Sequence, residues 1–430
     1  MKQLAIMIIE MLKNRNFEAY MIGGSIRNRL HNLLHKENLP IKDYDIVTNA
    51  SYNEVSNIFN NVSARGEQFK VAVVSIDNEE FEIAQYRGES YPKEGSLRPN
   101  KIHSVETLEE DVRRRDFTIN GIAEDETGEI TDYVCGVEDI ANKIIRTIGN
   151  AEERFAEDPL RMLRAIRFVS QLGYDLHKDT KKGIEKNLYR LKIIPHERVK
   201  EEINKTLKGK HVVKALKLMR ELKINKYPFY NSILKKEVYM FDSFFNSQEI
   251  TIKGAYRQLE QLKEKNLSLV DIYFVMYKQS DYEEAVKEFN NVMFLNSEEI
   301  FKVLVMIRHR IIIDVPHPQL FLSITDQIGE QRGLEYLKDI LNSLANIKGQ
   351  PLDSMFDLIL SQPLFKYQLP INGNDIVEEG LKLGINKKGK WISDALNLIQ
   401  RKTVTGEIYT LRSIIEEVTN EKHRIINKDR

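Results

Sequence analysis

The sequence predicts an α+β fold in which an N-terminal mixed sheet is followed by an all-helical extension. In the first third of the chain, short runs rich in β-branched or aromatic residues alternate with helical patterns, which is typical of a domain that contains both element types. From about residue 150 onward, apolar residues recur at helical spacing almost without interruption. The 430 residues, 42% apolar and 30% charged, fit a soluble protein of two to four domains.

The first predicted element is an amphipathic helix in the run LAIMIIEML. Glu10 interrupts this run, which is too short to cross a bilayer and lacks the basic start and cleavage site of a secretory signal. We therefore expect a cytoplasmic protein with no membrane partner.

Five strand-like runs follow the first helix: AYMIGG, DYDIVT, KVAVVSID, FEIAQYR and GEITDYV. Between the last two lies a polar stretch, residues 88–111, which contains prolines and glycine and has no clear period. Such stretches are uncommon unless they are mobile or functional. A further strand-like run, FTIN, comes directly after RRRD.

Charge and cysteine usage exclude few functions. Lys plus Arg and Asp plus Glu both number 64, so a nucleic-acid partner would need a local basic surface. The single cysteine, Cys135, rules out an internal disulfide and is expected to be a small core residue. Without a Cys/His cluster there is no zinc site, and no histidine is followed by Asp, so no HD-type phosphohydrolase motif is present.

Three carboxylates are candidate metal ligands. DYDIV predicts a strand on which Asp43 and Asp45 point to the same face. Adjacent carboxylates repel, and Mg²⁺, which prefers oxygen ligands and shares its shell with phosphates, relieves that repulsion. Burial of Phe81 and Ile83 would direct Glu82 toward the pair if the strands are neighbours. The alternative is that these acids simply face solvent. For Glu82, this alternative is equally well supported by the sequence.

A glycine turn precedes the acidic pair in YMIGGSIRNRL. Glycines let backbone N–H groups approach an anion, and the start of the following helix adds its positive end. Ser25 and Arg27 are then candidates to hold phosphate oxygens. An ordinary Gly-Gly turn is the alternative, but the nearby DxD pair favours a phosphate cradle beside a metal site.

The segment EDPLRMLRAIRF predicts a helix with a regular arginine series. Asp158 and Pro159 suit an N-cap and a first helical residue, which is a purely structural role. Arg161, Arg164 and Arg167 are three residues apart and stay on one side of the helix. A solvated basic face, or pairing with nearby acids, would equally explain them.

Hydrogen-bond chemistry gives the same segment a second interpretation. Cytosine and adenine each present an amino donor beside a ring-nitrogen acceptor, whereas uracil and guanine present a carbonyl beside a ring N–H. An acceptor on Asp158 beside a donor on Arg161 matches the first two bases and clashes with the others. In RRRDFTIN, Arg115 and Asp116 are candidates for ribose and phosphate contacts, with a salt-bridged loop as the alternative.

Together these motifs resemble those of the class II tRNA nucleotidyltransferases, the CCA-adding enzymes, in the bacterial form without a phosphohydrolase domain. The resemblance runs in order through GGSIRNRL, DYDIVT, FEIAQYR, RRRDFTIN, DYVCGVEDI, RFAEDPLRMLRAIRF, HERVKEEI, INGNDI and GKWISDALNLIQRKTVTGEI. It covers nearly the whole chain. Asn28 stands where the family usually has aspartate, and Cys135 where glycine is common.

The resemblance implies a catalytic head with the nucleotidyltransferase fold over residues 1–150. A helical neck over 151–212 would read the base, and a body over 213–345 and a tail over 346–430 would hold tRNA. It assigns Mg²⁺ to Asp43 and Asp45, with Glu82 as the third acid. The nucleotide-binding residues that it implies, together with Ser25 from the glycine turn, are Gly24, Arg27, Arg115, Asp116, Asp158, Arg161, Arg164 and Arg167.

The function implied is addition of CCA to the 3′ end of tRNA without a template, with CTP and ATP as substrates and pyrophosphate as product. The RNA 3′ hydroxyl would attack the α-phosphorus by a two-metal mechanism. Alternatives are a bacterial poly(A) polymerase, a partial enzyme adding only CC or only A, and a non-catalytic tRNA-binding protein. A homodimer is one assembly that the sequence leaves open.

Overall fold

The computed structural model describes residues 1–66, 71–90, 101–292, 294–308, 339–347, 373–385, 389–405 and 410–426. The chain forms two compact units. One comprises Met1–Leu269 with Glu283–Asn296, and the other comprises Val270–Tyr282 with Ser297–Arg430. The first unit carries the main sheet and all of the candidate site residues.

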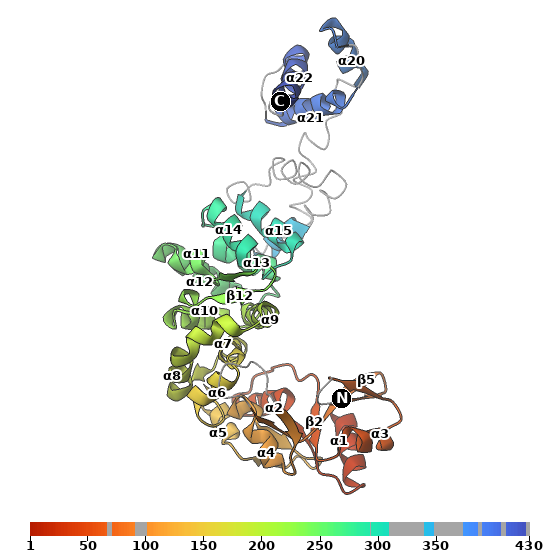
Figure 1. Ribbon diagram of the computed structural model, residues 1–430, viewed down its shortest axis with the longest axis vertical. Coiled ribbons are helices and arrows are strands. Elements are labelled where there is room, and N and C mark those ends of the chain that lie inside the picture. Colours follow the sequence, from red (N-terminus) through yellow and green to blue (C-terminus); the bar gives the residue numbers. More distant parts are fainter. Residues whose placement is uncertain are drawn as a thin grey trace. The chain divides into compact units, whose positions relative to one another are not determined.

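A seven-stranded mixed sheet forms the centre of the N-terminal part (Figure 1). Its spatial order is β3–β4–β5–β2–β1–β8–β9. β2 and β5 are parallel and the other neighbours are antiparallel, which confirms the predicted mixed sheet. The strands are β1 (Ala19–Ile22), β2 (Asp45–Thr48), β3 (Val62–Arg65), β4 (Val71–Ile76), β5 (Glu79–Gln85), β8 (Ile122–Glu124) and β9 (Ile130–Asp132).

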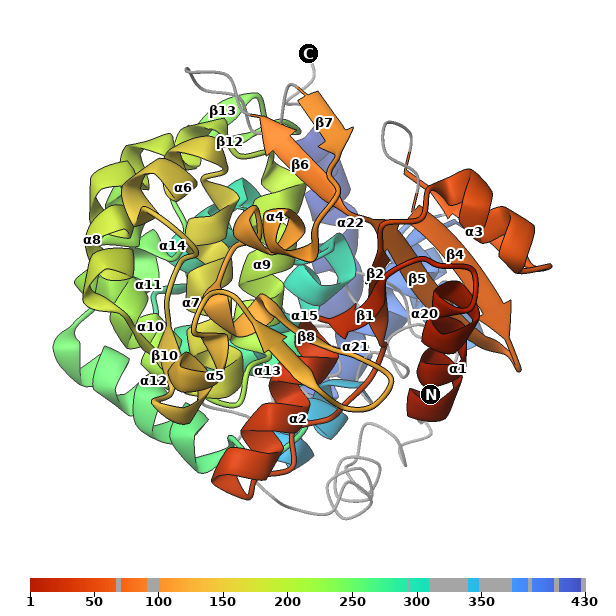
Figure 2. The same ribbon diagram turned by 90° about the horizontal axis from the view of Figure 1, so that it is seen from below.

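Short helices accompany this sheet, and local sequence signals fix where several of them begin. α1 (Lys2–Lys13) buries Ala5, Ile8, Ile9 and Leu12, so the predicted amphipathic first helix is confirmed. α3 and α4 each start with a capping box, in which an N-cap hydroxyl and a glutamate three residues later satisfy each other's backbone N–H groups. α2 and α5 lie side by side (Figure 2). The bounds are α2 (Gly24–His35), α3 (Tyr52–Ile58), α4 (Leu108–Arg113) and α5 (Gly136–Ala141).

Two expectations about the elements of this part are wrong in detail. The strand expected in FTIN is a 3₁₀ helix, η1 (Thr118–Asn120), and the strand begins at Ile122. The stretch 88–111 is not all loop, because β6 (Arg87–Ser90) pairs with β7 (Lys101–Ser104) and α4 follows; residues 91–100 lie outside the described residues.

Cys135 is exposed, not a small core residue. Its backbone has a left-handed φ of 60° at the start of α5. That conformation favours glycine, which accounts for glycine being common at this position in the resembled family.

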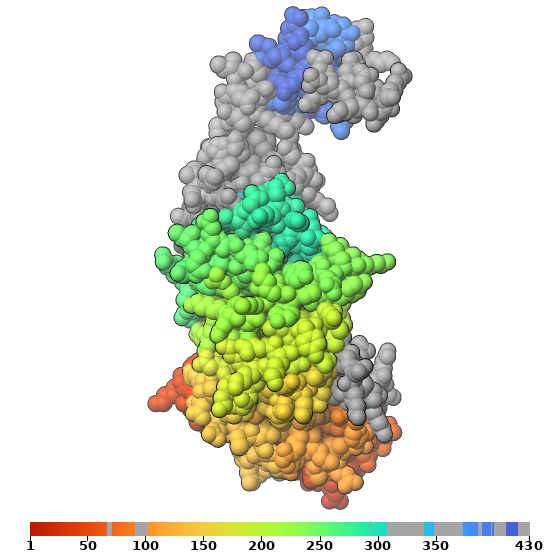
Figure 3. Space-filling model, turned by 60° about the vertical axis from the view of Figure 1, so that its left-hand side comes forward, coloured from red at the N-terminus to blue at the C-terminus, as the bar shows by residue number. Residues whose placement is uncertain are grey.

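The rest of the first unit is mostly helical, as predicted (Figures 1 and 3, yellow to green). It is not all-helical, because β12 (Phe229–Asn231) and β13 (Lys236–Val238) form a hairpin, and β10 (Ile144–Ile145) pairs in parallel with β11 (Asp175–Leu176). The helices are α6 (Ala151–Glu157), α7 (Leu160–Leu172), α8 (Lys178–Asn187), η2 (Leu188–Ile193), α9 (His196–Leu207), α10 (Val212–Glu221), η3 (Ile224–Lys226), α11 (Asp242–Asn246), α12 (Glu249–Gln261) and α14 (Tyr282–Val292).

The second unit is helical in its described residues. An apolar cluster around Ile376, Trp391 and Ile414 holds its last three helices together. Its elements are α13 (Leu269–Tyr277), α15 (Ser297–Arg308), α20 (Gly373–Lys382), α21 (Trp391–Thr405) and α22 (Leu411–Ile426). None of the helices in the described ranges combines the length and apolar character that spanning a bilayer requires.

Two helical glycines provide a test of the packing. α8 approaches α6 closely at Gly183, where a Cβ would lie 2.7 Å from the Cβ of Ala151, whereas nothing lies within 4 Å of a Cβ at Gly254 in α12. We expect Gly183→Ala to lower the free energy of unfolding by about 1–3 kcal/mol through overpacking. Gly254→Ala should raise it by about 0.5–1 kcal/mol through helix propensity. Urea unfolding measures both, and a midpoint for Gly183→Ala at or above that of the parent would contradict the close approach.

Candidate functional site

The acidic pair lies at the start of β2. The strand begins at Asp45, so the expectation that Asp43 is part of it is wrong. Tyr44 between them is only 6% exposed, and the two aspartates are exposed. From Asp43 to Asp45, exposed and buried side chains therefore alternate, and both carboxylates stay accessible to solvent.

Glu82 lies on the strand beside Asp45. β2 and β5 are parallel neighbours in the register Ile46 to Ile83, so the residues one position earlier, Asp45 and Glu82, are also adjacent and share a face. Phe81 and Ile83 are buried, which meets the condition set for Glu82. The Glu82 carboxylate is, however, paired with the Arg65 guanidinium from β3.

The surroundings of Asp45 disfavour its charged form. The pKa of the Asp45 carboxyl is raised to about 6. Protein atoms crowding its surroundings remove water from around it, and the charges of Glu82 and Asp43 add to this, while Arg115 offsets part of the effect. A carboxyl in this position gains from any cation bound beside it.

The glycine turn lies against Asp45. Gly23 has a φ of +86°, a conformation that favours glycine, and a Cβ there would lie 3.6 Å from Asp45 Oδ2. α2 begins at the next residue, so its first backbone N–H groups are presented beside the acidic pair. Ser25 is 4% exposed, and its hydroxyl has no hydrogen-bond partner among the residues that the structure describes. A donor of this kind at a helix start fits a phosphate oxygen.

Arg27 is buried and already holds several contacts. Its guanidinium donates to Asn120 Oδ1 at 2.7 Å and to Asn28 Oδ1 at 2.9 and 3.0 Å. It also lies over the Phe168 ring, 5.1 Å from the centroid. Burial and the neighbouring Arg167 lower the pKa of Arg27 to about 10. Asn28, at the position where the family has aspartate, therefore still accepts from this arginine.

Asp116 links the segment RRRDFTIN to α7. Its Oδ1 accepts from the Phe117 backbone N–H at 2.8 Å and from Asn120 at 3.1 Å, and its Oδ2 accepts from Arg164 Nε and Nη2 at 2.8 and 2.5 Å. Burial would raise the pKa of Asp116, but Arg164 and these hydrogen bonds outweigh it and hold the pKa well below its usual range. Arg115 bonds the buried carboxylate of Asp111 at 2.9 Å.

The arginines on α7 do not form a solvated basic face. Arg161 is 5% exposed and donates to Glu157 at 3.0 Å and to the Arg114 carbonyl at 3.3 Å. Arg167 Nε lies 2.9 Å from Glu202 Oε2 in α9, and Arg164 Nη1 lies 3.9 Å from Glu202 Oε1. Each of the three arginines therefore has an acidic partner, as the pairing alternative allowed.

Asp158 lies one residue earlier than the capping interpretation expects, because the N-cap of α7 is Pro159, but its carboxylate still accepts from the start of the helix. It precedes the helix, and its Oδ1 accepts from the Leu160 backbone N–H at 3.1 Å. Its Oδ2 lies 3.6 Å from an Arg198 nitrogen. One oxygen thus serves the helix, and the second keeps acceptor capacity on the side of α9.

Several residues of this site were not singled out from the sequence. Asn120 joins Arg27 to Asp116, and Glu202 holds Arg164 and Arg167. Phe168 lies within 6 Å of the guanidinium carbons of Arg27, Arg164 and Arg167. Asn120 and Glu202 lie in the motifs RRRDFTIN and HERVKEEI, but only tertiary contacts distinguish them from their neighbours.

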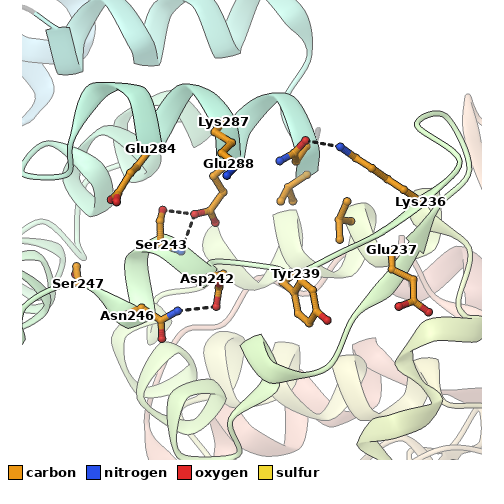
Figure 4. Close-up of a pocket in the computed structure, with 13 residues that line it drawn as sticks. Lys236, Glu237, Tyr239, Asp242, Ser243, Asn246, Ser247, Glu284, Lys287 and Glu288 are labelled. Atoms are coloured by element: carbon orange, nitrogen blue, oxygen red, sulfur yellow. Dashed lines mark hydrogen bonds between the residues drawn. The ribbon is translucent and has the colours of Figure 1, made fainter.

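A separate hollow of about 500 Å³ lies between β13, α11 and α14 (Figure 4). In it, Glu288 accepts from the Ser243 backbone N–H at 2.9 Å, and Asp242 accepts from Asn246 at 2.7 Å. Its lining contains more acidic than basic side chains and none of the predicted site residues. It is unsuited to a triphosphate.

The residues at the acidic pair fit a divalent cation that is bound by both the carboxylates and the phosphate oxygens of a substrate. Among the described residues, no three His, Cys, Asp or Glu side chains are gathered closely enough to hold a metal ion. Asp43 and Asp45 nevertheless offer two accessible oxygen donors beside an anion-binding helix start, and Mg²⁺ usually completes its shell with water and phosphate oxygens. Glu82 would join them only after leaving Arg65.

The Asp116 carboxylate makes stability depend on pH. Its folded-state pKa lies below the ordinary value of 3.8, so its contribution is fully present above pH 4 and is lost as pH falls toward the lower, folded-state pKa. Asp116→Asn should lower the free energy of unfolding by about 1–3 kcal/mol at pH 7, because the half-buried Arg164 loses its charged hydrogen-bond partner, and should flatten the acid side of the stability profile. Urea unfolding from pH 7 to 2.5 measures this, and an unchanged slope would contradict it.

Comparisons with known proteins identify the family of this chain. The family model "Poly A polymerase head domain" matches residues 19–146, and "Probable RNA and SrmB- binding site of polymerase A" matches residues 173–233. The chain is 32% identical over 98% of its length to the CCA-adding enzyme of Geobacillus stearothermophilus, covering 95% of that protein. It is 33% identical over 97% of its length to that of Bacillus cereus strain G9842, also covering 95%.

Solved structures give the same result. The crystal structure of the Bacillus stearothermophilus CCA-adding enzyme in complex with CTP matches 100% of this chain and 99% of its own, with a TM-score of 0.69 and 28% identity. The Thermotoga maritima CCA-adding enzyme complexed with tRNA shares the fold over 97% of this chain and 95% of its own, with a TM-score of 0.55 at 18% identity. With relatives above 30% identity along nearly its entire length, this chain belongs to the family of CCA-adding enzymes.

Proposed function

We propose that this protein adds C, C and A to the 3′ end of tRNA without a nucleic-acid template, using CTP and ATP and releasing pyrophosphate. The observation that carries this proposal is the glycine turn and helix start against Asp45, within a chain that belongs to the CCA-adding enzymes. A bacterial poly(A) polymerase, or an enzyme adding only CC or only A, is the alternative.

In the proposed mechanism, Asp43 and Asp45 hold Mg²⁺, and Glu82 is the third acid after release from Arg65. When bound there, Mg²⁺ would supply charge that lowers the pKa of the attacking RNA hydroxyl and neutralises the triphosphate. The N–H groups at Gly24 and the Ser25 hydroxyl bind phosphate oxygens, which fixes the triphosphate beside the two aspartates.

The second half of the nucleotide pocket comes from RRRDFTIN and α7. Arg115 contacts the phosphates, and Asp116 accepts from the ribose. Asp158 Oδ2 and Arg161 read the base edge, and Arg27, Arg164 and Arg167 supply positive charge. Arg164 is held by Asp116, and Arg161 by Glu157, so nucleotide binding would exchange some of these protein contacts for contacts to the substrate.

We also propose the division into a head (1–150), neck (151–212), body (213–345) and tail (346–430), with tRNA held by the helical parts. The match of residues 19–146 to a polymerase head model supports the first of these. Three tail lysines in the turn KKGKW, Lys387, Lys388 and Lys390, are candidates for phosphate contacts to tRNA, and Lys387 and Lys388 lie outside the described residues. Location in the cytoplasm and assembly as a homodimer stay predictions.

Incorporation assays test the activity directly. Purified protein is incubated with tRNA lacking its 3′ CCA and with each labelled nucleotide, alone and combined. We expect two C and one A per tRNA. Repeated A addition would identify a poly(A) polymerase. Addition of CC alone or A alone would identify a partial enzyme, and no product would refute the catalytic function.

In the same assay Asp43→Ala should lose at least about 10³-fold in rate, on the order of 4 kcal/mol of transition-state stabilisation. The affinity of Asp43→Ala for tRNA should stay at the parental value. Asp179→Ala, which also removes an aspartate but not one assigned to the site, is the control and should keep the parental rate. An active Asp43→Ala protein would refute the metal assignment.

The two roles of Asp158 can be separated by a conservative substitution. Asp158→Asn keeps an oxygen that caps α7 but replaces the second acceptor with an amide donor. We expect the preference for CTP and ATP over UTP and GTP, measured as ratios of kcat/KM, to fall by about 10- to 100-fold. Asp158→Ser, which also caps the helix, controls for stability. An unchanged preference in Asp158→Asn would leave only the capping role.

A further inference from the structure

A hollow of about 610 Å³ between α10 and α12 contains none of the residues assigned above to the catalytic site. Its lining includes Lys217 and Arg220 from α10, and Lys253, Tyr256 and Arg257 from α12. α10 and α12 are packed neighbours within the first unit (Figure 1). Four of these five side chains are cationic, in a protein whose overall formal charge is zero.

Two of the four cations are free to bind an anion. Arg220 is 2.6 Å from Glu249, and Lys253 is 3.7 Å from the same carboxylate. The other acid of the lining, Glu260, is 3.2 Å from Lys263. Lys217 and Arg257 make no ion pair within the described part of the chain. The acids of the hollow are therefore neutralised, and two positive charges are left over.

Tyr256 supplies an unused donor in the same lining. The residue is 8% exposed, and its hydroxyl has no hydrogen-bond partner among the described residues. Burial raises the pKa of Tyr256 to about 12, so the group is a neutral O–H at physiological pH. Lys217 Nζ lies 5.8 Å from the centre of the Tyr256 ring. A buried hydroxyl without a partner is uncommon unless a ligand or water satisfies it.

We propose that this hollow binds a phosphate group of the substrate RNA backbone, through Lys217, Arg257 and the Tyr256 hydroxyl. A phosphate accepts hydrogen bonds from all three donors and balances the two unpaired charges. Lys217 and Arg220 lie within residues 173–233, which match a model of a probable RNA-binding site. This inference rests on the proposed function, because it takes tRNA as the substrate.

Binding of tRNA lacking its CCA end, measured by fluorescence anisotropy at several salt concentrations, tests the proposal. The double variant Lys217→Gln/Arg257→Gln should raise Kd about tenfold and lower the slope of log Kd against log salt by about one, the effect of one lost phosphate contact. Tyr256→Phe, which removes only the hydroxyl, should raise Kd by a smaller factor with the slope unchanged. Lys143→Gln, which removes a lysine of the head that is paired with Glu37, should match the parent.

Incorporation kinetics separate failure of this site from failure of the proposed function. The double variant should raise KM for tRNA while kcat and KM for CTP stay at parental values. A parent without activity would instead refute the function.

Thermal unfolding with inorganic phosphate distinguishes the source of the ligand. Parental tRNA affinity together with phosphate stabilisation lost in the double variant would keep the anion site but overturn RNA as its ligand. Parental values in both measurements would overturn the proposal.

Discussion

The half-buried ion pair between Asp116 and Arg164 is the interaction on which the candidate site depends. Asp116 follows α4, and Arg164 lies in the middle of α7, 48 residues later. Two charges taken out of water are costly unless each satisfies the other, and loss of one partner leaves the second buried without compensation. The pair therefore fixes α7 against the sheet-bearing part of the first unit. Asn120 extends this contact to Arg27 on α2, and Glu202 extends it to Arg167.

This network explains why the arginine series is mostly buried. Regular spacing keeps the three side chains on one side of the helix, where they meet the carboxylates of Glu157, Asp116 and Glu202. Each guanidinium has an acidic partner, which compensates for the loss of water around its charge. The same contacts occupy the N–H donors of the arginine. A triphosphate with several negative charges competes for such arginines more effectively than a single carboxylate does. On the proposed function, stability and substrate binding would therefore depend on the same side chains.

Much of the candidate site was accessible to sequence reasoning, because local rules govern its parts. The turn before α2 requires a positive φ and has glycine, and Asp45 is the exposed first residue of β2, whose other three residues are buried. The burial of Phe81 and Ile83 directs Glu82 as the period of a strand requires. Less was accessible where non-local contacts decide. FTIN has the composition of a strand, yet it forms a 3₁₀ helix, with its Thr118 hydroxyl bonded to Asp139.

The sequence by itself determined the class of fold, most of the helices and strands, and the set of candidate site residues, because these follow from periodicity, capping and residue type. Only the tertiary structure decided that β2 and β5 are neighbours, that Asp116 holds Arg164, and that Glu82 is paired with Arg65. Such pairings join residues distant in the chain. Their free energy depends on distance and on exclusion of water, neither of which is encoded in local sequence.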